Sequence, residues 1–167
     1  MAQLTAQERL QPSLLDRLQD DATNETRESS DKRVFSIDRL RESVLRDLAW
    51  LLNTSNLEQT EDLDQYPEVK TSVLNYGVPE MAGSHISTTD LTELERFVKQ
   101  AVLDFEPRIL PDTVKVRVVV SDSEEHHNRF TLEIEGDMWS QPLPLQIYVN
   151  TTVDLESGDI NLDQYLC

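Results

Sequence analysis

The chain has 167 residues, 38% of them apolar, which is enough for one domain with a substantial core. It carries 32 acidic and 15 basic side chains, for a formal charge of −17. Phosphate backbones and anionic lipid surfaces repel a chain this acidic, so we expect neither nucleic acid nor membrane partners.

The sequence also argues against secretion and membrane insertion. Its N-terminus has no apolar run of the kind found in signal peptides, and no segment approaches the ~20 apolar residues of a membrane span. Cys167 is the only cysteine, so no intramolecular disulfide can form, as is usual in a reducing compartment. We therefore expect a cytoplasmic protein.

We predict an N-terminal arm over residues 1–33 and a single domain over residues 34–167. Pro12 and Ser13 suit the start of a short helix within an amphipathic element at residues 10–18 of the arm. Three leucines fall on one stripe of that helix: Leu14, Leu15 and Leu18. The helix could dock on the domain or on a neighbouring chain. Residues 19–33 are polar and charged, which is typical of a linker.

Two helical segments are expected at the start of the domain. The first covers residues 36–53, with Ser36 as its N-cap. Its apolar residues recur every three or four positions: Ile37, Leu40, Val44, Leu45, Leu48, Leu51 and Leu52. Pro67 is expected to open a second, short helix over residues 68–74, closed near Gly77.

A third helix is predicted to lead to the middle of the chain. Asp90 and Glu93 resemble a capping box, with Asp90 in the cap position. The residues that line one face of this helix are Leu91, Leu94, Val98, Ala101, Val102 and Phe105. Pro107 lacks an amide hydrogen and disfavours helical geometry in the residue before it, so the helix should end at Phe105 or Glu106.

A rigid, charged turn follows this helix. Glu106 is a carboxylate at a helix C-terminus, where the macrodipole disfavours negative charge. The nearest cation is Arg108, whose planar guanidinium suits a carboxylate. As an exposed ion pair the two would contribute ~0–1 kcal/mol. As a docking corner for a partner chain they would form a desolvated pair, and loss of one member would cost ~3–5 kcal/mol. The residues alone leave both interpretations open.

The second half of the chain changes to a period of two. Alternating apolar residues predict strands at residues 114–120, 129–135 and 145–153, and a short strand near residues 160–162. Strands do not alternate with helices as a parallel sheet requires. We predict an α+β fold in which N-terminal helices pack on one face of a mostly antiparallel sheet of about four strands.

A search for catalytic groups gives little. Glu133 and Glu135 share one face of a strand and could act as a carboxylate pair, but a polar sheet face does not supply the apolar pocket that raises a pKa. His126 and His127 are adjacent in a loop, a poor arrangement for binding one metal. The chain has four scattered glycines and no glycine-rich phosphate loop. We expect no cofactor, no metal and no enzymatic activity.

Several segments, in this order and spacing, resemble the TssE family. Its members are baseplate wedge subunits of bacterial type VI secretion systems, related to the phage T4 wedge protein that initiates the tail sheath. The segments that carry the resemblance are residues 13–18, 43–53, 66–69, 72–77, 105–108 and 154–158.

The family's Glu-Pro-Arg motif falls here on Glu106, Pro107 and Arg108. The resemblance implies that this motif contacts the wedge subunits TssF and TssG, with TssK as a further baseplate partner. It also implies that the β-rich half templates the TssB/TssC sheath by strand addition at an open sheet edge, for which the strand near Ile160 is a candidate. Assembly would take place at the cytoplasmic face of the inner membrane. Arg108→Ala would leave a folded protein that no longer binds TssF and TssG.

Two alternatives remain from the residues. One is a peptidoglycan hydrolase that uses Glu133 and Glu135 as acid and nucleophile. The other is an acidic adaptor for an unrelated basic protein. The adaptor alternative is based on the acidity of the C-terminal portion. Seven acidic residues follow Arg129 there, and no lysine or arginine does.

Overall fold

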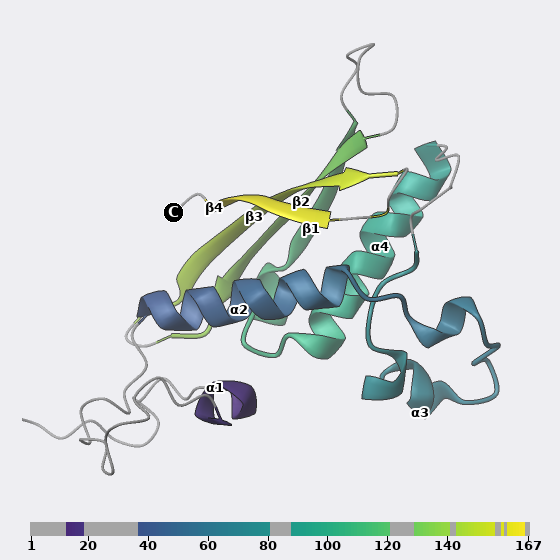
Figure 1. Ribbon diagram of the computed structural model, residues 1–167, viewed down its shortest axis with the longest axis horizontal. Helices are drawn as coiled ribbons and strands as arrows, with labels where there is room; N and C mark the ends of the chain where they lie inside the picture. Colours follow the sequence, from purple (N-terminus) through teal and green to yellow (C-terminus); the bar gives the residue numbers. More distant parts are fainter. Residues whose placement is uncertain are drawn as a thin grey trace, which may run out of the picture.

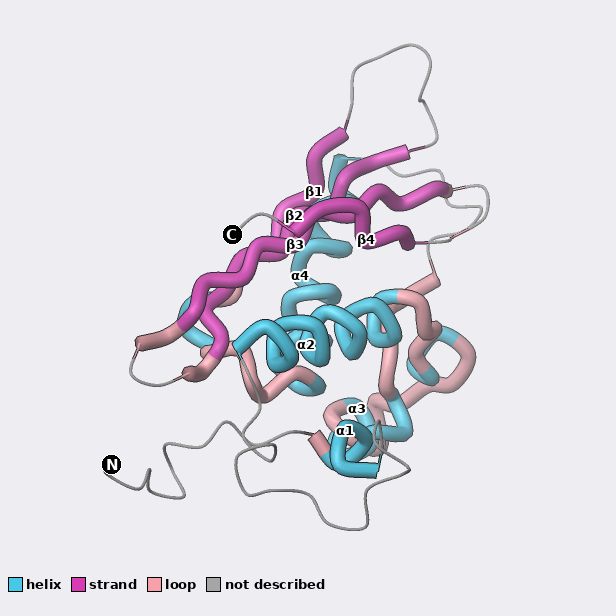
Figure 2. The backbone as a smooth tube through the Cα atoms, turned by 60° about the vertical axis from the view of Figure 1, so that its left-hand side comes forward, coloured by secondary structure: helices cyan, strands magenta, loops and turns pink. Residues whose placement is uncertain are grey.

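The computed structural model describes residues 13–18, 37–80, 88–120, 129–140, 143–155, 158 and 160–165. It confirms the predicted α+β class, since helices come first and an antiparallel sheet follows. Figures 1 and 2 show the sheet as one layer, with α2 and α4 against the same face. The predicted cap at Ser36, the loop with His126 and His127, and Cys167 lie outside the described residues.

Helix α2 (Ile37–Leu52) matches the prediction closely. Its buried residues follow the predicted apolar stripe with the addition of Ser43, while Ile37, the first residue of the predicted stripe, is 45% exposed. The buried residues are Leu40, Ser43, Val44, Leu45, Leu48, Leu51 and Leu52. Trp50 lies off this stripe and is 51% exposed, with the Arg46 guanidinium 5.1 Å from its ring centroid. The helix therefore buries one face, while its other side carries the charged residues.

Helix α4 (Thr88–Phe105) ends where Pro107 predicts, but it begins two residues before Asp90. The predicted cap position is therefore wrong, and Asp90 belongs to the first helical turn. The helix dipole favours an acidic residue both at the cap and in the first turn, so the sequence signal did not separate the two positions.

The strands β1 (Lys115–Val120), β2 (Arg129–Met138), β3 (Leu145–Asp154) and β4 (Ile160–Tyr165) pair antiparallel in chain order. Burial alternates along β2 and β3, as the period of two predicts. The buried rows meet α2 and α4 in a single core. Its largest fully buried side chains are Leu48, Leu51, Leu132, Ile134 and Met138.

A side chain bonds each outer edge of the sheet, one from α4 and one from the residue that follows α2. The N–H of Val118 in β1 donates to Glu95 Oε1 of α4 at 2.8 Å. At the start of β4, the Asn53 side chain bonds both the N–H and the carbonyl of Ile160, each at 3.1 Å. The alternation predicted for the first strand fails at its end, because Val119 and Val120 are both exposed on this edge strand.

The segment between α2 and α4 contains η1 (Leu57–Gln59), α3 (Pro67–Lys70) and η2 (Val73–Asn75). Pro67 opens α3 as predicted, but the helix stops after one turn, because the Ser72 hydroxyl accepts the N–H of Leu74 and starts η2. At the base of the segment, Val78 donates to the Thr54 carbonyl at 2.8 Å.

Gly77 makes this closure possible, with a φ of +127° that side-chain-bearing residues rarely adopt. A Cβ at this position would lie 2.2 Å from the Thr54 carbonyl oxygen. We expect Gly77→Ala to lower the free energy of unfolding by about 2 kcal/mol or more, measured by urea denaturation.

Gly158→Ala is the matched control, because Gly158 also has a positive φ, of +76°, which lies near the left-handed helical region. That substitution should cost only about 1 kcal/mol. Equal losses in the two variants would contradict the steric argument for Gly77.

Candidate functional site

The predicted turn forms an elbow, residues 106–110, that joins α4 to the sheet. Glu106 is 3% exposed, and its N–H donates to the Val102 carbonyl at 2.9 Å. Two backbone bonds, each of 2.8 Å, tie the elbow to the end of β2: Leu110 donates to Asp137 and Trp139 donates to Arg108. The elbow is therefore fixed by its backbone before any side chain is considered.

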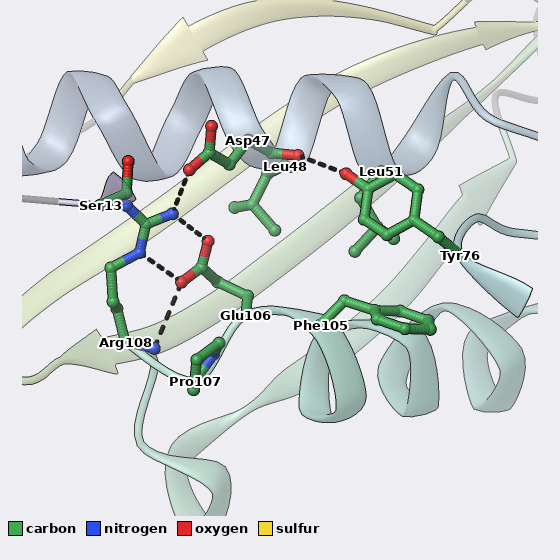
Figure 3. Close-up of a pocket in the computed structure, with 9 residues that line it drawn as sticks. All are labelled: Ser13, Asp47, Leu48, Leu51, Tyr76, Phe105, Glu106, Pro107 and Arg108. Atoms are coloured by element: carbon green, nitrogen blue, oxygen red, sulfur yellow. Dashed lines mark hydrogen bonds and ion pairs between the residues drawn. The ribbon is translucent and has the colours of Figure 1, made fainter. Parts of the chain in front are cut away.

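Arg108 compensates Glu106, as the sequence predicted, but it also reaches across to α2 (Figure 3). Its Nε donates to Glu106 Oε1 at 2.6 Å, and its Nη2 donates to both Glu106 Oε2 and Asp47 Oδ2. Its Nη1 donates to Ser43 Oγ at 2.7 Å. The pair is therefore not a solvated surface bridge, because the protein's own side chains hold both charges and Glu106 is buried.

The contacts continue into a closed ring that we call the elbow ring: Arg108, Asp47, Arg46, Asp16 and Ser43. Asp47 Oδ1 accepts from Arg46 Nε and Nη2 at 3.0 and 2.9 Å. Arg46 Nη1 donates to Asp16 Oδ1 at 2.7 Å. Asp16 Oδ2 accepts from Ser43 Oγ at 2.8 Å, and Ser43 in turn meets Arg108. The ring joins α2, the elbow and the N-terminal arm.

Helix α1 (Leu14–Leu18) is attached to the domain by this ring. Ser13 and Asp16 form a capping box, since the Asp16 N–H donates to Ser13 Oγ and the Ser13 N–H donates to Asp16 Oδ2. The leucine stripe faces outward: Leu14 is 73%, Leu15 38% and Leu18 74% exposed. Of the two options left open by the sequence, α1 thus docks on the domain, but it does so through its polar side.

The ring shifts the pKa values of its members. Burial alone would raise the pKa of Asp16, but hydrogen bonds from Ser13, Arg46 and Ser43 outweigh it and lower the pKa to about 2. Burial works against the charged form of Arg108 too, yet its bonds to Glu106 and Asp47 raise its pKa above the usual value. Asp16 and Arg108 are thus both charged at neutral pH.

A cleft of about 440 Å³ opens beside Arg108, between α2 and the end of α4 (Figure 3). Ser13 lies at one end, while Tyr76 and Phe105 close the other with an edge-to-face contact of 5.2 Å between ring centroids. Leu48 and Leu51 of α2 also line it. The lining is mostly apolar with one charged corner, which suits a bulky apolar group better than a polar substrate.

The candidate catalytic carboxylates have a different setting. Glu135 is 30% exposed on the outer sheet face, with Lys115 Nζ 3.6 Å away. Glu133 is hydrogen-bonded to the Tyr148 hydroxyl. Burial and the two nearby carboxylates together raise the pKa of Tyr148. Neither lines the cleft. Within the described residues, no group of three or more histidine, cysteine or acidic side chains is arranged to hold a metal ion. The geometry gives the hydrolase alternative no support.

Sequence reasoning missed four members of the site, namely Asp16, Ser43, Arg46 and Asp47. Asp16 and Arg46 are 30 residues apart, and Asp47 and Arg108 are 61 apart, so no local spacing connects them. The one available signal was Ser43, a small polar residue on the otherwise apolar stripe of α2.

Comparison with protein families identifies a family to which the chain belongs. A family described as "Baseplate wedge protein gp25" matches residues 38–143, more than half of the chain. The match includes the elbow and the first two strands and excludes α1. Comparison with curated proteins found no match. None of the described helices has the length and apolar composition that a bilayer crossing demands.

The structure changes what Arg108 substitutions should do. Removing the guanidinium leaves Glu106 charged and buried, so we expect Arg108→Met to lower the free energy of unfolding by about 3–5 kcal/mol, measured by urea denaturation. The same reasoning applies to Arg108→Ala, so that variant should be less stable than the wild type wherever it remains folded.

The double variant Glu106→Gln/Arg108→Met removes the stranded charge and should recover at least about 1 kcal/mol of that loss. Arg117→Met, on the exposed face of β1, is the control and should change stability by less than about 0.5 kcal/mol. Equal losses in the single and double variants would show that the Glu106 charge is not what Arg108 neutralises.

The pKa of Asp16 predicts how α1 responds to acid. Because the folded-state pKa is about 2 against an ordinary 3.8, docking of α1 is favoured above pH ~4 and weakens as the pH falls towards 2. NMR titration of the Asp16 carboxyl carbon should give a midpoint near 2 that rises in Arg46→Gln. A midpoint near 4 in the unmodified protein would mean that α1 is not held by this contact.

Proposed function

Because the chain belongs to the family of the baseplate wedge protein gp25, a family of structural baseplate proteins, we propose that it is the wedge subunit of a type VI secretion baseplate. In this role it docks on TssF and TssG at the Glu106-Pro107-Arg108 corner, beside TssK in the assembled baseplate. It has no catalytic role. Assembly takes place in the cytoplasm, against the inner membrane.

The corner supports this proposal by its rigidity. Pro107 is exposed at the tip of the elbow, while Glu106 is buried behind it and Arg108 is 21% exposed. The two charges fix the turn from inside, and Pro107 presents a preformed apolar surface. A preformed surface loses little conformational entropy on binding, which favours docking without rearrangement.

The β-rich half supports a second part of the proposal, that the sheet templates the TssB/TssC sheath by strand addition. The edge of β1 has its central N–H, on Val118, occupied by Glu95. On β4, Asn53 bonds the backbone of Ile160, at the end of the strand and not at its centre. Since strand addition requires unpaired backbone groups along the edge, we infer that β4 is the more suitable edge.

The experiment uses Pro107→Lys, which places a bulky charge at the corner without removing an internal bond. Loss of proline rigidity should cost at most about 1 kcal/mol. We expect the folded variant to lose co-purification with TssF and TssG and to fail in sheath assembly. Lys115→Ala, on β1 away from the corner, should bind as the wild type does. Normal co-purification together with normal sheath assembly by Pro107→Lys would contradict the proposal.

A further inference from the structure

The cleft beside Arg108 combines an apolar interior with a charged corner. Its volume of about 440 Å³ lies within the range of pockets that enclose small molecules, so one long side chain can enter it. Leucines of α2 line its middle, Tyr76 and Phe105 close one end, and Asp47, Glu106 and Arg108 form the other (Figure 3). A group that fills the cleft must therefore be apolar along most of its length and compatible with the charges at its tip.

The charged corner carries more carboxyl groups than cations. Arg108 is the one cation among the described residues that line the cleft, against the carboxyl groups of Asp47 and Glu106. The elbow ring together with Glu106 holds three carboxyl groups and two guanidinium groups: Asp16, Asp47, Glu106, Arg46 and Arg108. The formal balance is thus an excess of one carboxyl group.

The guanidinium of Arg108 has little to offer an anion. Its Nε and Nη2 donate to Glu106, its Nη2 also donates to Asp47, and its Nη1 donates to Ser43. The Asp47 side chain, by contrast, is 24% exposed, and each carboxylate oxygen can accept more than one hydrogen bond. The corner therefore favours an incoming donor over an incoming acceptor.

The aromatic end of the cleft experiences the same negative charge. Burial raises the pKa of the Tyr76 hydroxyl, and the charges of Asp47 and Glu106 raise it further. The rings of Tyr76 and Phe105 also attract a cation that lies over a ring face. Both ends of the cleft thus favour positive charge, while its middle favours apolar atoms.

We propose that the cleft receives one arginine or lysine side chain from a partner wedge subunit, with the aliphatic stem along Leu48 and Leu51 and the charged group at Asp47. The inference rests on the proposed function for the identity of the partner, and it adds the chemistry that the elbow recognises. The formal charge of −17 attracts a basic segment over longer distances and disfavours a second copy of the chain as occupant.

Two substitutions of Pro107 test the charge of the occupant. Pro107 is exposed and lines the cleft, and Pro107→Glu and Pro107→Lys both lose the proline ring but bring opposite charges. At low salt, Pro107→Glu should bind the co-expressed TssF–TssG complex at least about fivefold more tightly than Pro107→Lys, and the ratio should shrink as salt is added. Thr92→Glu and Thr92→Lys, at an exposed position near the other end of α4, are the matched control and should bind alike.

A second measurement needs no partner subunit. N-acetyl-arginine methylamide and its neutral isostere, N-acetyl-citrulline methylamide, are titrated at constant ionic strength into the isotope-labelled full chain and followed by NMR. The arginine compound should shift the amide signals of Leu48, Leu51 and Tyr76 and bind at least about threefold more tightly than the citrulline compound. Its binding should strengthen in Pro107→Glu and weaken in Pro107→Lys.

The possible outcomes separate this inference from the proposed function. If Pro107→Glu and Pro107→Lys lose TssF–TssG binding equally, the corner is a steric contact, so the inference fails while the proposed function stands. If the wild type binds neither TssF nor TssG, the proposed function fails and takes the partner's identity with it, and the titration alone decides whether the cleft takes a cation. Equal binding of the two capped compounds, or no saturable shift at the cleft with the arginine compound, would overturn the inference.

Discussion

The structure depends on one buried carboxylate and the guanidinium that neutralises it. Glu106 is 3% exposed at the C-terminus of α4, where both burial and the helix dipole disfavour its charge. The charge of this carboxylate is compensated by Arg108, two residues further along the chain, whose guanidinium donates hydrogen bonds to both Glu106 carboxylate oxygens. Proline between them fixes the reversal that makes this geometry possible.

The same guanidinium decides how the layers fit together. With two of its nitrogens on Glu106, it still has donors for Asp47 and Ser43, and so sets the position of α2 relative to the elbow. Arg46 and Asp16 extend this order to α1, a helix too short to be stable in isolation. Charge-assisted hydrogen bonds thus hold α1 by its polar side, which leaves its leucine stripe at the surface.

The sequence predicts those parts of the fold that depend on local periodicity. The stripe of α2, the stop at Phe105 and the alternation of β2 and β3 are each encoded within one element, and each is confirmed. The start of α4 and the split between α3 and η2 were not predicted correctly, because acidic and hydroxyl residues favour several cap positions equally. The motif was visible, yet its closest partners, Ser43 and Asp47, are more than sixty residues away and give no local signal.

The central claim is that Glu106 and Arg108 remain paired inside the protein while the surface they shape contacts the partner. A structure of this chain in the assembled wedge tests it most directly. The account predicts that Arg108 keeps its bonds to Glu106, Asp47 and Ser43 in the complex and that a cationic side chain of the partner occupies the cleft beside it. An Arg108 side chain swung out of the ring and bonded to a carboxylate of the partner, with no cationic side chain in the cleft, would contradict it.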